Sequence, residues 1–337
     1  MDKSTKLCLL SLYTAYPENK KLTLAFLGCG NIVHSHVKAI RWADKNIDLC
    51  FASRQKEKAK NYLSKHNGKQ AFGSYDEAIN NEEVDIIFIT TPPKYHYELA
   101  KKAINNNKHV IVEKPPFFES KHISELGKLA DSKQKQLLIS ENYFYKPMRY
   151  KVREMLDSGI VGKPLFINLA ATKLQKSKKD WREDKDLTGF GALFEGGIHW
   201  INFMNNLGMD ITTVQGFRPI DNGELERSMQ VTANTSQGTI INLQYSWEVN
   251  TLLFGLRLSK ILGTEGSITF ESNGILLIAR GNKKKISFPG LSKITGFKPM
   301  FRDFFASLRA GKQPELTYQM AQKDLEIIEA AYQSLES

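Results

Sequence analysis

Apolar runs alternate with helix-like patterns over the first 140 residues of the 337-residue chain. Unbroken apolar runs predict buried strands, and amphipathic stretches between them predict helices. The predicted strands are 22–27, 47–52, 84–90, 109–112 and 137–140; the predicted helices are 55–66, 96–106 and 120–132, with a further helical stripe formed by Ile32, Val37 and Ile40. Strands that alternate with helices in this way form a parallel, doubly wound sheet.

The pattern changes after Tyr150. Helices are predicted at 149–158 and at about 193–207, with a strand at 165–170 between them. From Ile211 to about Phe288, β-like runs follow one another without helices, which predicts a mainly antiparallel sheet. These runs include 238–247, 253–262 and 266–271, and two helices, 301–310 and 318–335, close the chain.

The whole pattern predicts an α/β protein of two domains. We expect a short extension over residues 1–20 and a nucleotide-binding domain with the parallel sheet over 21–145. A second α/β domain with an open, mainly antiparallel sheet should follow over 146–337, with its C-terminal helices able to pack back on the first domain.

Composition and charge narrow the possible partners. The chain is 41% hydrophobic and 25% charged, with a formal net charge of +11. Its lysines are scattered, and the densest cluster, 173–182, lacks the interleaved aromatic residues of a nucleic-acid platform. We therefore expect no nucleic-acid partner; the charges are interpreted as solvated surface, with attraction of an anionic ligand as the alternative.

Cysteine usage and hydropathy favour the cytoplasm. Cys8, Cys29 and Cys50 form no C-x-x-C pair, so neither a disulfide framework nor a structural zinc site is expected. No apolar stretch reaches transmembrane length, so no membrane partner is expected. The first residues weakly resemble a secretion signal, but polar residues interrupt the apolar run and no cleavage pattern follows.

The first strand ends in a glycine-rich turn, LGCGNIVHSH, which nearly matches G-x-G-x-x-G. Gly28 and Gly30 would let the backbone approach a pyrophosphate, and the following helix would supply N–H donors. Val33 stands where a third glycine is usual. Nucleotide binding is favoured over a plain turn because of the alternating context. His34 and His36 do not share a helix face, so packing or capping is favoured over a metal site.

The end of the second predicted strand bears on the choice of cofactor. It carries Ser53 and Arg54 and has no carboxylate before Glu57. An acidic residue here would bond the ribose hydroxyls of NAD, whereas serine and arginine suit the extra phosphate of NADP. NADP(H) is therefore favoured, with NAD(H) possible; the alternative is that Arg54 is an ordinary surface residue.

The next two strand ends read TTPPKYH and VEKPPF. Because ligands of open α/β sheets bind beyond the carboxyl ends of the strands, Lys114 is predicted at the mouth of the cofactor crevice. There it could stabilise negative charge that develops on a reacting oxygen. A solvated loop lysine is the alternative.

A carboxylate and a histidine lie one predicted helical turn apart. Glu195 and His199 are separated by four residues, which places them on one helix face and suggests a general acid/base. A metal pair is disfavoured because no third ligand of suitable type is nearby. The dense glycines around them indicate a close approach to the backbone. Tyr143 and Tyr145 are the next proton-transfer candidates.

Together these motifs resemble the Gfo/Idh/MocA oxidoreductases, named for glucose–fructose oxidoreductase and inositol dehydrogenase. The resemblance rests on GCGNIVHSH, with His36 in the place of the family's histidine, and on TPPKYH, EKP (113–115), VREMLDSGIVGKP, the stretch 181–199 and the ending PELTYQMAQKDLEIIEAAYQS. It implies a Rossmann domain, then a domain whose open sheet often mediates dimers or tetramers. It also implies nicotinamide-dependent chemistry on a secondary alcohol or ketone of a sugar, cyclitol or related molecule.

The resemblance assigns roles by position. Lys114 matches the substrate-orienting lysine and His199 the catalytic histidine, while Glu195 and Asn202 replace aspartates, and Val33 and Phe190 replace glycines. With the reasoning above, the expected catalytic residues are Lys114, His199 and Glu195. The expected cofactor-binding residues are Gly28, Gly30, Asn31, Ile32, Ser53, Arg54, Thr91, Pro92, His96, Glu113 and Lys114. The expected substrate-binding residues are Lys114, Tyr143, Tyr145, Trp181, Arg182, Glu195 and His199.

The leading hypothesis is an NAD(P)-dependent dehydrogenase or reductase acting on a polyol, sugar or nucleotide sugar. The alternatives are a hydrolase or lyase that uses tightly held NAD, and a regulatory protein that senses NADP(H) without catalysis. We also expect a homodimer or homotetramer joined through an apolar patch of the open sheet, with Tyr245, Trp247, Leu253 and Phe254 as candidates.

Overall fold

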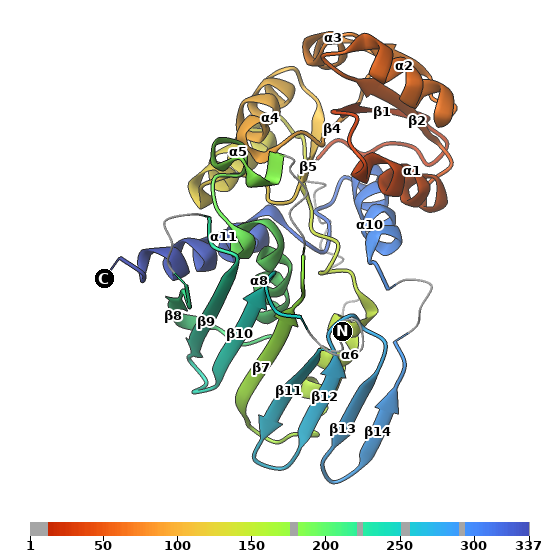
Figure 1. Cartoon of the computed structure of the whole chain (residues 1–337). Coiled ribbons are helices and arrows are strands. Elements are labelled where there is room, and N and C mark those ends of the chain that lie inside the picture. The colour runs from red at the N-terminus through yellow and green to blue at the C-terminus, as the bar shows by residue number, and fades with distance from the viewer. Residues whose placement is uncertain (1–12, 176–180, 221–224, 251–256, 290–293, 337) are drawn as a thin grey trace, which may run out of the picture.

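The computed structural model describes residues 13–175, 181–220, 225–250, 257–289 and 294–336. They form a six-stranded sheet and an eight-stranded sheet, with helices on and between them (Figure 1). In this part of the chain, none of the helices combines the length and apolar character needed to cross a bilayer.

The first sheet is parallel throughout, with strand order β3-β2-β1-β4-β5-β6. Its direction of winding reverses between β1 and β4, which is the Rossmann arrangement. The strands are β1 (Leu22–Leu27), β2 (Ile47–Ala52), β3 (Gln70–Phe72), β4 (Ile86–Ile89), β5 (His109–Glu113) and β6 (Leu137–Ser140). The helices are α1 (Ile32–Ala43), α2 (Lys56–Lys65), α3 (Tyr75–Asn80), α4 (His96–Asn105) and α5 (Ser120–Ser132).

Burial explains why these strands could be read from apolar runs. Every residue of β1, β4, β5 and β6 is buried, because helices cover both faces of the sheet. The predicted parallel, doubly wound sheet is confirmed.

The second sheet is mixed and mostly antiparallel, with order β14-β13-β12-β11-β7-β10-β9-β8. Strands β7 and β10 pair in parallel; the other neighbouring pairs are antiparallel. The strands are β7 (Pro164–Thr172), β8 (Ile211–Phe217), β9 (Ser228–Thr235), β10 (Ile240–Ser246), β11 (Leu258–Gly263), β12 (Ser267–Glu271), β13 (Leu277–Arg280) and β14 (Lys284–Ser287). The expected open, mainly antiparallel sheet is thus confirmed.

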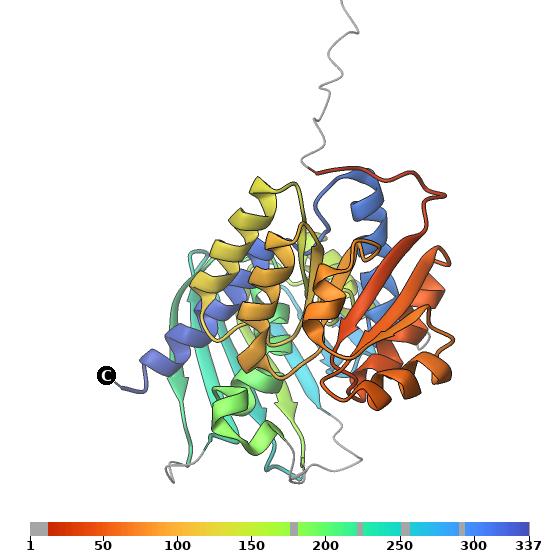
Figure 2. The ribbon, with the colours of Figure 1, turned by 90° about the horizontal axis from the view of Figure 1, so that it is seen from above.

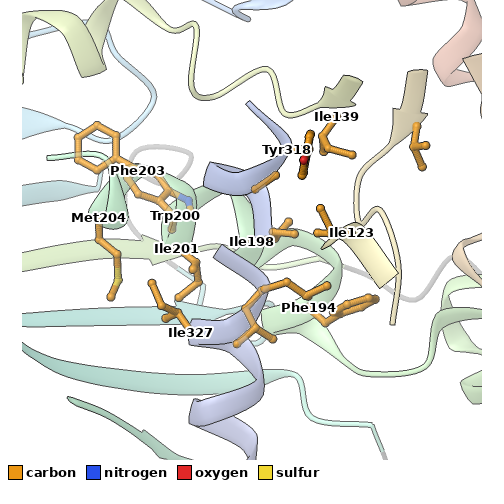
Figure 3. Packing of buried hydrophobic residues seen from close by; sticks show 14 of the residues in the cluster. Ile123, Ile139, Phe194, Ile198, Trp200, Ile201, Phe203, Met204, Tyr318 and Ile327 are labelled. Carbon is orange, nitrogen blue, oxygen red and sulfur yellow. The ribbon is translucent and has the colours of Figure 1, made fainter. Parts of the chain in front are cut away.

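Helices connect the two sheets. Helix α6 (Pro147–Asp157) follows the parallel sheet, and α8 (Ile198–Asn205) lies on the inner face of the mixed sheet. Helix α10 (Phe297–Ala310) packs on α1, and α11 (Tyr318–Gln333) contacts α5 on one side and α8 and β8 on the other (Figure 2). Figure 3 shows Ile201 and Met204 of α8 in the cluster that also holds Ile327 of α11 and Ile123 of α5. The domain boundaries at residues 20/21 and 145/146 stay predictions.

The strand register shows that Tyr245 and Trp247 were wrongly expected in the apolar patch that joins protomers. Tyr245 and Trp247 are buried, because Tyr245 shares the inner face with Ile241 and Leu243, and Trp247 continues the same alternation. These two residues therefore cannot form an outer patch, and Leu253 and Phe254 lie outside the described residues. The outer face instead exposes apolar side chains of β7 and β11, namely Phe166, Leu258 and Leu262. A homo-oligomer stays a prediction.

A buried carboxyl group joins α8 to α11. Asp324 is 2% exposed, and its oxygens accept hydrogen bonds from the amides of Asn202 (2.6 Å) and Asn205 (2.8 Å). Burial raises the pKa of Asp324 to about 8, although both amides favour the charged form. The carboxyl group is therefore protonated in the folded protein at neutral pH.

Replacing Asp324 with asparagine should change the pH dependence of stability. The pKa in the folded state lies above the unfolded value of about 3.9, so the free energy of unfolding falls as pH rises between these values, by at most about 1.4 kcal/mol per pH unit from this group. In Asp324→Asn this fall is absent, so the stability of the variant relative to wild type should increase with pH. Urea unfolding at several pH values tests this, with the exposed Asp210→Asn as control. Parallel profiles for wild type and Asp324→Asn would contradict it.

Candidate active site

A cavity of about 240 Å³ lies where the carboxyl edge of the parallel sheet meets the inner face of the mixed sheet. Lys114 follows β5 and Tyr143 follows β6, while His199 and Trp200 come from the start of α8. The full lining is Lys114, Tyr143, Lys173, Gln175, Arg182, Glu195, Gly196, His199, Trp200, Tyr245 and Arg257. The structure therefore brings together five of the seven predicted substrate-binding residues.

His199 is oriented by a carboxylate that the sequence analysis did not single out. Its Nδ1 lies 2.7 and 2.8 Å from the two carboxylate oxygens of Glu141, which is 2% exposed. An ionised carboxylate only accepts hydrogen bonds, so Nδ1 carries the proton and Nε2 of the neutral ring is the basic nitrogen. The sequence does contain a signal for Glu141, because this residue directly follows the predicted strand 137–140, at the same edge of the sheet as Lys114.

Glu195 makes its contacts elsewhere, which corrects the expectation that it would orient His199. The chain forms a π-helical turn over Leu193–Gly197, so α-helical spacing does not hold between Glu195 and His199. The Glu195 carboxylate instead lies 3.2 Å from Arg182 Nε and 3.5 Å from Lys114 Nζ. Burial opposes the ionisation of Glu195, but the charges of Lys114 and Arg182 outweigh it and lower the pKa of this carboxyl to about 2.

Glu195 also holds the side chain of Lys114 through its backbone carbonyl. Its Nζ donates a hydrogen bond of 2.7 Å to the backbone carbonyl of Glu195, which is 81 positions further along the chain. The backbone N–H of Lys114 donates to the side chain of Glu113, and the Lys114–Pro115 peptide is cis. The backbone of Lys114 is thus fixed at the end of β5, and its ammonium group is held by the π-helical turn before α8.

A stack of three side chains extends from His199 into the protein. The Tyr143 ring lies parallel to the imidazole at 4.2 Å, and Lys146 Nζ lies 3.3 Å from the centre of the Tyr143 ring. Burial lowers the pKa of Lys146 to about 7, against the opposing effect of Glu141. Burial also lowers the pKa of His199; Glu141 opposes this shift, and the charges of Lys114 and Lys146 reinforce it.

The turn after β1 fits a dinucleotide pyrophosphate. Gly28 has φ +107°, and a Cβ there would lie 3.0 Å from the carbonyl oxygen of Thr90. Thr90 Oγ1 fixes the turn by donating to the carbonyl of Gly28 at 2.8 Å. A Cβ at Gly30 would meet no atom within 4 Å, and α1, which begins at Ile32 with Asn31 before it, has no side-chain cap. Backbone donors are therefore open to an anion here.

The end of β2 fits an adenosine phosphate as well. The Ser53 side chain is buried and accepts a hydrogen bond of 3.2 Å from the N–H of Gln55. Arg54 is exposed, and its guanidinium lies 5.8 Å from the centre of the Tyr95 ring, from the segment after β4. Ser53 and Arg54 thus lie at the carboxyl edge of the sheet, as expected for the cofactor crevice.

Several predicted cofactor-binding residues hold loops in place. His96 is buried, and its ring nitrogens contact the carbonyls of Thr91 (2.7 Å) and Pro116 (2.9 Å), joining the loops after β4 and β5. The buried Glu113 carboxylate lies 2.5 Å from His36 Nε2. Burial opposes its ionisation, but His36 and Lys114 lower the pKa of Glu113. His96 and Glu113 are therefore positioning residues in this geometry.

Thr91 and Pro92 lie at the carboxyl end of β4, beside the crevice. In the described part of the chain, the buried Thr91 Oγ1 has no hydrogen-bond partner.

The two histidines after the glycine-rich turn, His34 and His36, have different partners. His34 Nδ1 lies 2.7 Å from His66 Nε2, while His36 contacts Glu113. Among the described residues, no three His, Cys, Asp or Glu side chains gather as a metal site would require.

Two predicted substrate-binding residues are not among the described residues that line the cavity. Tyr145 is buried beneath α10, where its hydroxyl donates to Asp303 at 2.7 Å and accepts from the N–H of Leu316. Its apolar ring packs in the core, so placing it in the substrate site was wrong. Trp181 is not among the lining residues, and its ring lies 4.5 Å from the Arg182 guanidinium. The sequence analysis missed Lys173, Gln175 and Arg257, which reach the cavity only through the pairing of distant strands.

Comparison with known proteins agrees with both halves of the fold. Residues 22–141 match the oxidoreductase family with an NAD-binding Rossmann fold, and residues 150–269 match the GFO/IDH/MocA C-terminal domain. The chain belongs to the Gfo/Idh/MocA family. Its parallel sheet is therefore an NAD-binding Rossmann domain, and the resemblance noted in the sequence is confirmed.

Curated relatives of this Gfo/Idh/MocA member are distant. A trans-1,2-dihydrobenzene-1,2-diol dehydrogenase of Xenopus tropicalis is 25% identical over 74% of this chain and 75% of its own length. A dTDP-3,4-didehydro-2,6-dideoxy-alpha-D-glucose 3-reductase of Actinomadura kijaniata is 26% identical over 67% of this chain and 69% of its own. For an uncharacterized oxidoreductase of Synechocystis, 25% identical over 62% of this chain, the match spans only 60% of the relative's length.

Solved structures share the Gfo/Idh/MocA fold over nearly the whole chain. An aldose-aldose oxidoreductase from Caulobacter crescentus, complexed with glycerol, has a TM-score of 0.83 at 21% identity, covering 94% of this chain and 98% of its own. A variant of a 3-ketoreductase from Actinomadura kijaniata, in complex with TDP-benzene and NADP, has a TM-score of 0.82 at 20% identity, with 94% and 98% covered.

Removing the charge of Lys146 should raise the pKa of His199. Lys146 is protonated below about pH 7, and its positive charge, one ring away, disfavours the imidazolium. Lys146→Met keeps most of the stem, so titration of the His199 ring protons by NMR should shift to higher pH. Lys146→Arg keeps the charge and should leave the titration near that of wild type. An unchanged midpoint in the methionine variant would contradict this coupling.

Proposed function

We propose that this Gfo/Idh/MocA member transfers a hydride between a nicotinamide cofactor, preferentially NADP(H), and a secondary alcohol or ketone of a sugar, cyclitol or related polyol. The observation that carries the proposal is the meeting of Lys114 and His199 in one cavity at the carboxyl edge of the Rossmann sheet. The names of relatives that act on a diol or on a deoxy sugar support the same class of reaction.

His199 is the proposed proton donor and acceptor. Oxidation of an alcohol removes a proton from the oxygen as the hydride leaves the carbon, and reduction returns both. With its Nδ1 proton bonded to Glu141, the imidazole has Nε2 available to take the proton of the substrate hydroxyl. Glu141 then stabilises the imidazolium and keeps the ring oriented, as carboxylates do in other histidine sites.

Lys114 is the proposed partner of the reacting oxygen. An ammonium group has three donors, and two of them point to the backbone carbonyl and the carboxylate of Glu195. Among the described residues this leaves the third donor for a substrate oxygen, whose negative form it would stabilise. Arg182 shares the Glu195 carboxylate, so Glu195 acts here by holding both cations.

The bound cofactor supplies or accepts the hydride. This chain would hold it through the Gly28–Ile32 turn and through Ser53 and Arg54. The absence of a carboxylate at the end of β2 supports NADP(H), since an acidic residue there would repel the additional phosphate.

Arg54 should determine the cofactor preference. A charge-assisted hydrogen bond to the extra phosphate is worth about 1.5–3 kcal/mol, or roughly a ten- to hundredfold preference for NADPH over NADH. Arg54→Gln should remove most of this preference while NADH binding stays unchanged. Fluorescence titration with both cofactors measures it, with Lys65→Gln at the far end of α2 as control. Equal binding of the two cofactors to wild type would refute the assignment.

Loss of His199 or Lys114 should abolish most turnover without loss of cofactor binding. A positioned acid/base contributes a factor of about 10²–10⁴, so His199→Ala and Lys114→Met should each lower kcat by at least about 10²-fold. Glu141→Gln should slow proton transfer by His199 more than Glu195→Gln does, because only Glu141 forms a hydrogen bond with the imidazole. The test is nicotinamide absorbance with a substrate identified from sugars, inositols and nucleotide sugars.

His122→Ala, on α5, is the matched control and should retain wild-type kcat. Near-normal turnover in His199→Ala would show that another group moves the proton. Product formation without net change in nicotinamide absorbance would instead indicate a hydrolase or lyase that oxidises its substrate only transiently.

A further inference from the structure

The cavity at Lys114 and His199 is strongly cationic. Among the described lining residues, one carboxylate, that of Glu195, faces four positively charged side chains; they are Lys114, Lys173, Arg182 and Arg257. The other described lining residues carry no formal charge when His199 is neutral. A cavity lined by charges of one sign attracts a ligand of the opposite sign.

Neighbouring carboxylates are already engaged. Glu141 is bonded to His199, and both oxygens of Glu271 accept hydrogen bonds of 2.8 Å from Asn273. They reduce the positive potential at longer range, but neither bonds Arg257. The guanidinium of Arg257 reaches Asn273 through Nη2 only.

One hydrogen-bond donor of the Arg257 guanidinium requires an acceptor. In the part of the chain that the structure describes, its buried Nε has no hydrogen-bond partner. A buried donor without an acceptor is costly, and such groups are rare unless a ligand or water completes them. A guanidinium also pairs in fork geometry with carboxylate and phosphate oxygens.

The cations that line the cavity come from both sheets. Lys114 follows β5 of the parallel sheet, whereas Lys173 follows β7 and Arg257 precedes β11 of the mixed sheet. None of the predicted pyrophosphate or ribose-phosphate residues, such as Gly28 or Arg54, lines this cavity. Arg257 is therefore not accounted for by the phosphates of the cofactor.

We infer that the substrate is an anion: a small sugar or polyol with a carboxylate or phosphate group that Arg257 binds while the carbon to be oxidised or reduced lies at Lys114 and His199. This inference rests on the proposed function and narrows its substrate class. The cavity, about 240 Å³, is smaller than the roughly 300–1,000 Å³ typical of drug-sized ligands, which favours a single sugar unit inside it.

Three probes with one carbon skeleton test the inference: D-glucose, D-glucuronate and D-glucose 6-phosphate. Their binding to the NADPH-loaded protein is measured by calorimetry. At least one anion should bind tenfold or more tightly than glucose. Tighter binding of glucuronate indicates a carboxylate site, and tighter binding of glucose 6-phosphate indicates a phosphate site. Arg257→Met should weaken that anion about ten- to hundredfold, the effect of one charge-assisted hydrogen bond, and leave glucose unchanged.

Lys260→Met is the matched control, because Lys260 lies on the exposed face of β11, three residues after Arg257. It removes one positive charge and should change none of the three affinities. Equal affinities for glucose and both anions, no binding of any probe, or equal weakening of all three in Arg257→Met would overturn the inference.

A second readout separates this inference from the proposed function. Hydride transfer with a neutral polyol, but no preference for the anions, would retain the oxidoreductase and reject the anionic substrate. Arg257-dependent binding of an anion, with no hydride transfer to or from any member of the substrate panel, would support the anion site and count against the proposed reaction.

Discussion

The buried carboxylate of Glu141 and the half-buried His199 form a hydrogen bond of 2.7 Å between the end of the parallel sheet and the first turn of α8. A buried carboxylate requires partners, because removing it from water costs far more than an ordinary polar group. The same requirement applies to Lys114 and Glu195, which meet across the same junction. These two contacts set the position of α8 relative to the Rossmann sheet, and with it the geometry of the cavity.

The packing around these contacts is correspondingly tight. A Cβ at Gly196 would collide with the Tyr245 hydroxyl, which accepts a hydrogen bond of 3.0 Å from the Trp247 indole. The inner face of the mixed sheet can therefore approach the π-helical turn closely, and this brings Tyr245 into the lining of the cavity. The glycines that the sequence shows around Glu195 serve contacts made by the chain's own side chains.

Much of the fold could be predicted from the sequence because its strands are buried on both faces. The predicted ranges for β1, β2 and β6 match the structure, since unbroken apolar runs mark such strands clearly. Strand β3 was not predicted: it has three residues, and its first, Gln70, is exposed. The π-helical turn at Leu193–Gly197 was also not predicted, because the four-residue spacing that suggested a helix is equally compatible with a local insertion.

The candidate site could be predicted only in part. Lys114, His199 and Arg182 belong to local motifs, so they could be found without knowing what lies opposite them. Glu141 could be placed at the edge of the parallel sheet because it follows a predicted strand, but its contact with His199 joins distant segments, as does the approach of Arg257 to the cavity, and no spacing in the sequence indicates such a contact. The identity of the residue that orients His199 therefore came from the structure, and it moves the orienting role from Glu195 to Glu141.

The central claim is that the cofactor crevice and the cationic cavity form one site in which Lys114 and His199 contact the reacting atoms. A crystal structure of the protein with NADP and an anionic polyol tests it most directly. The account predicts the nicotinamide C4 and the substrate carbon about 3–3.5 Å apart, with the attached oxygen within hydrogen-bond distance of both Lys114 Nζ and His199 Nε2. A nicotinamide ring directed away from this cavity, or a polyol bound without contact to either side chain, would contradict it.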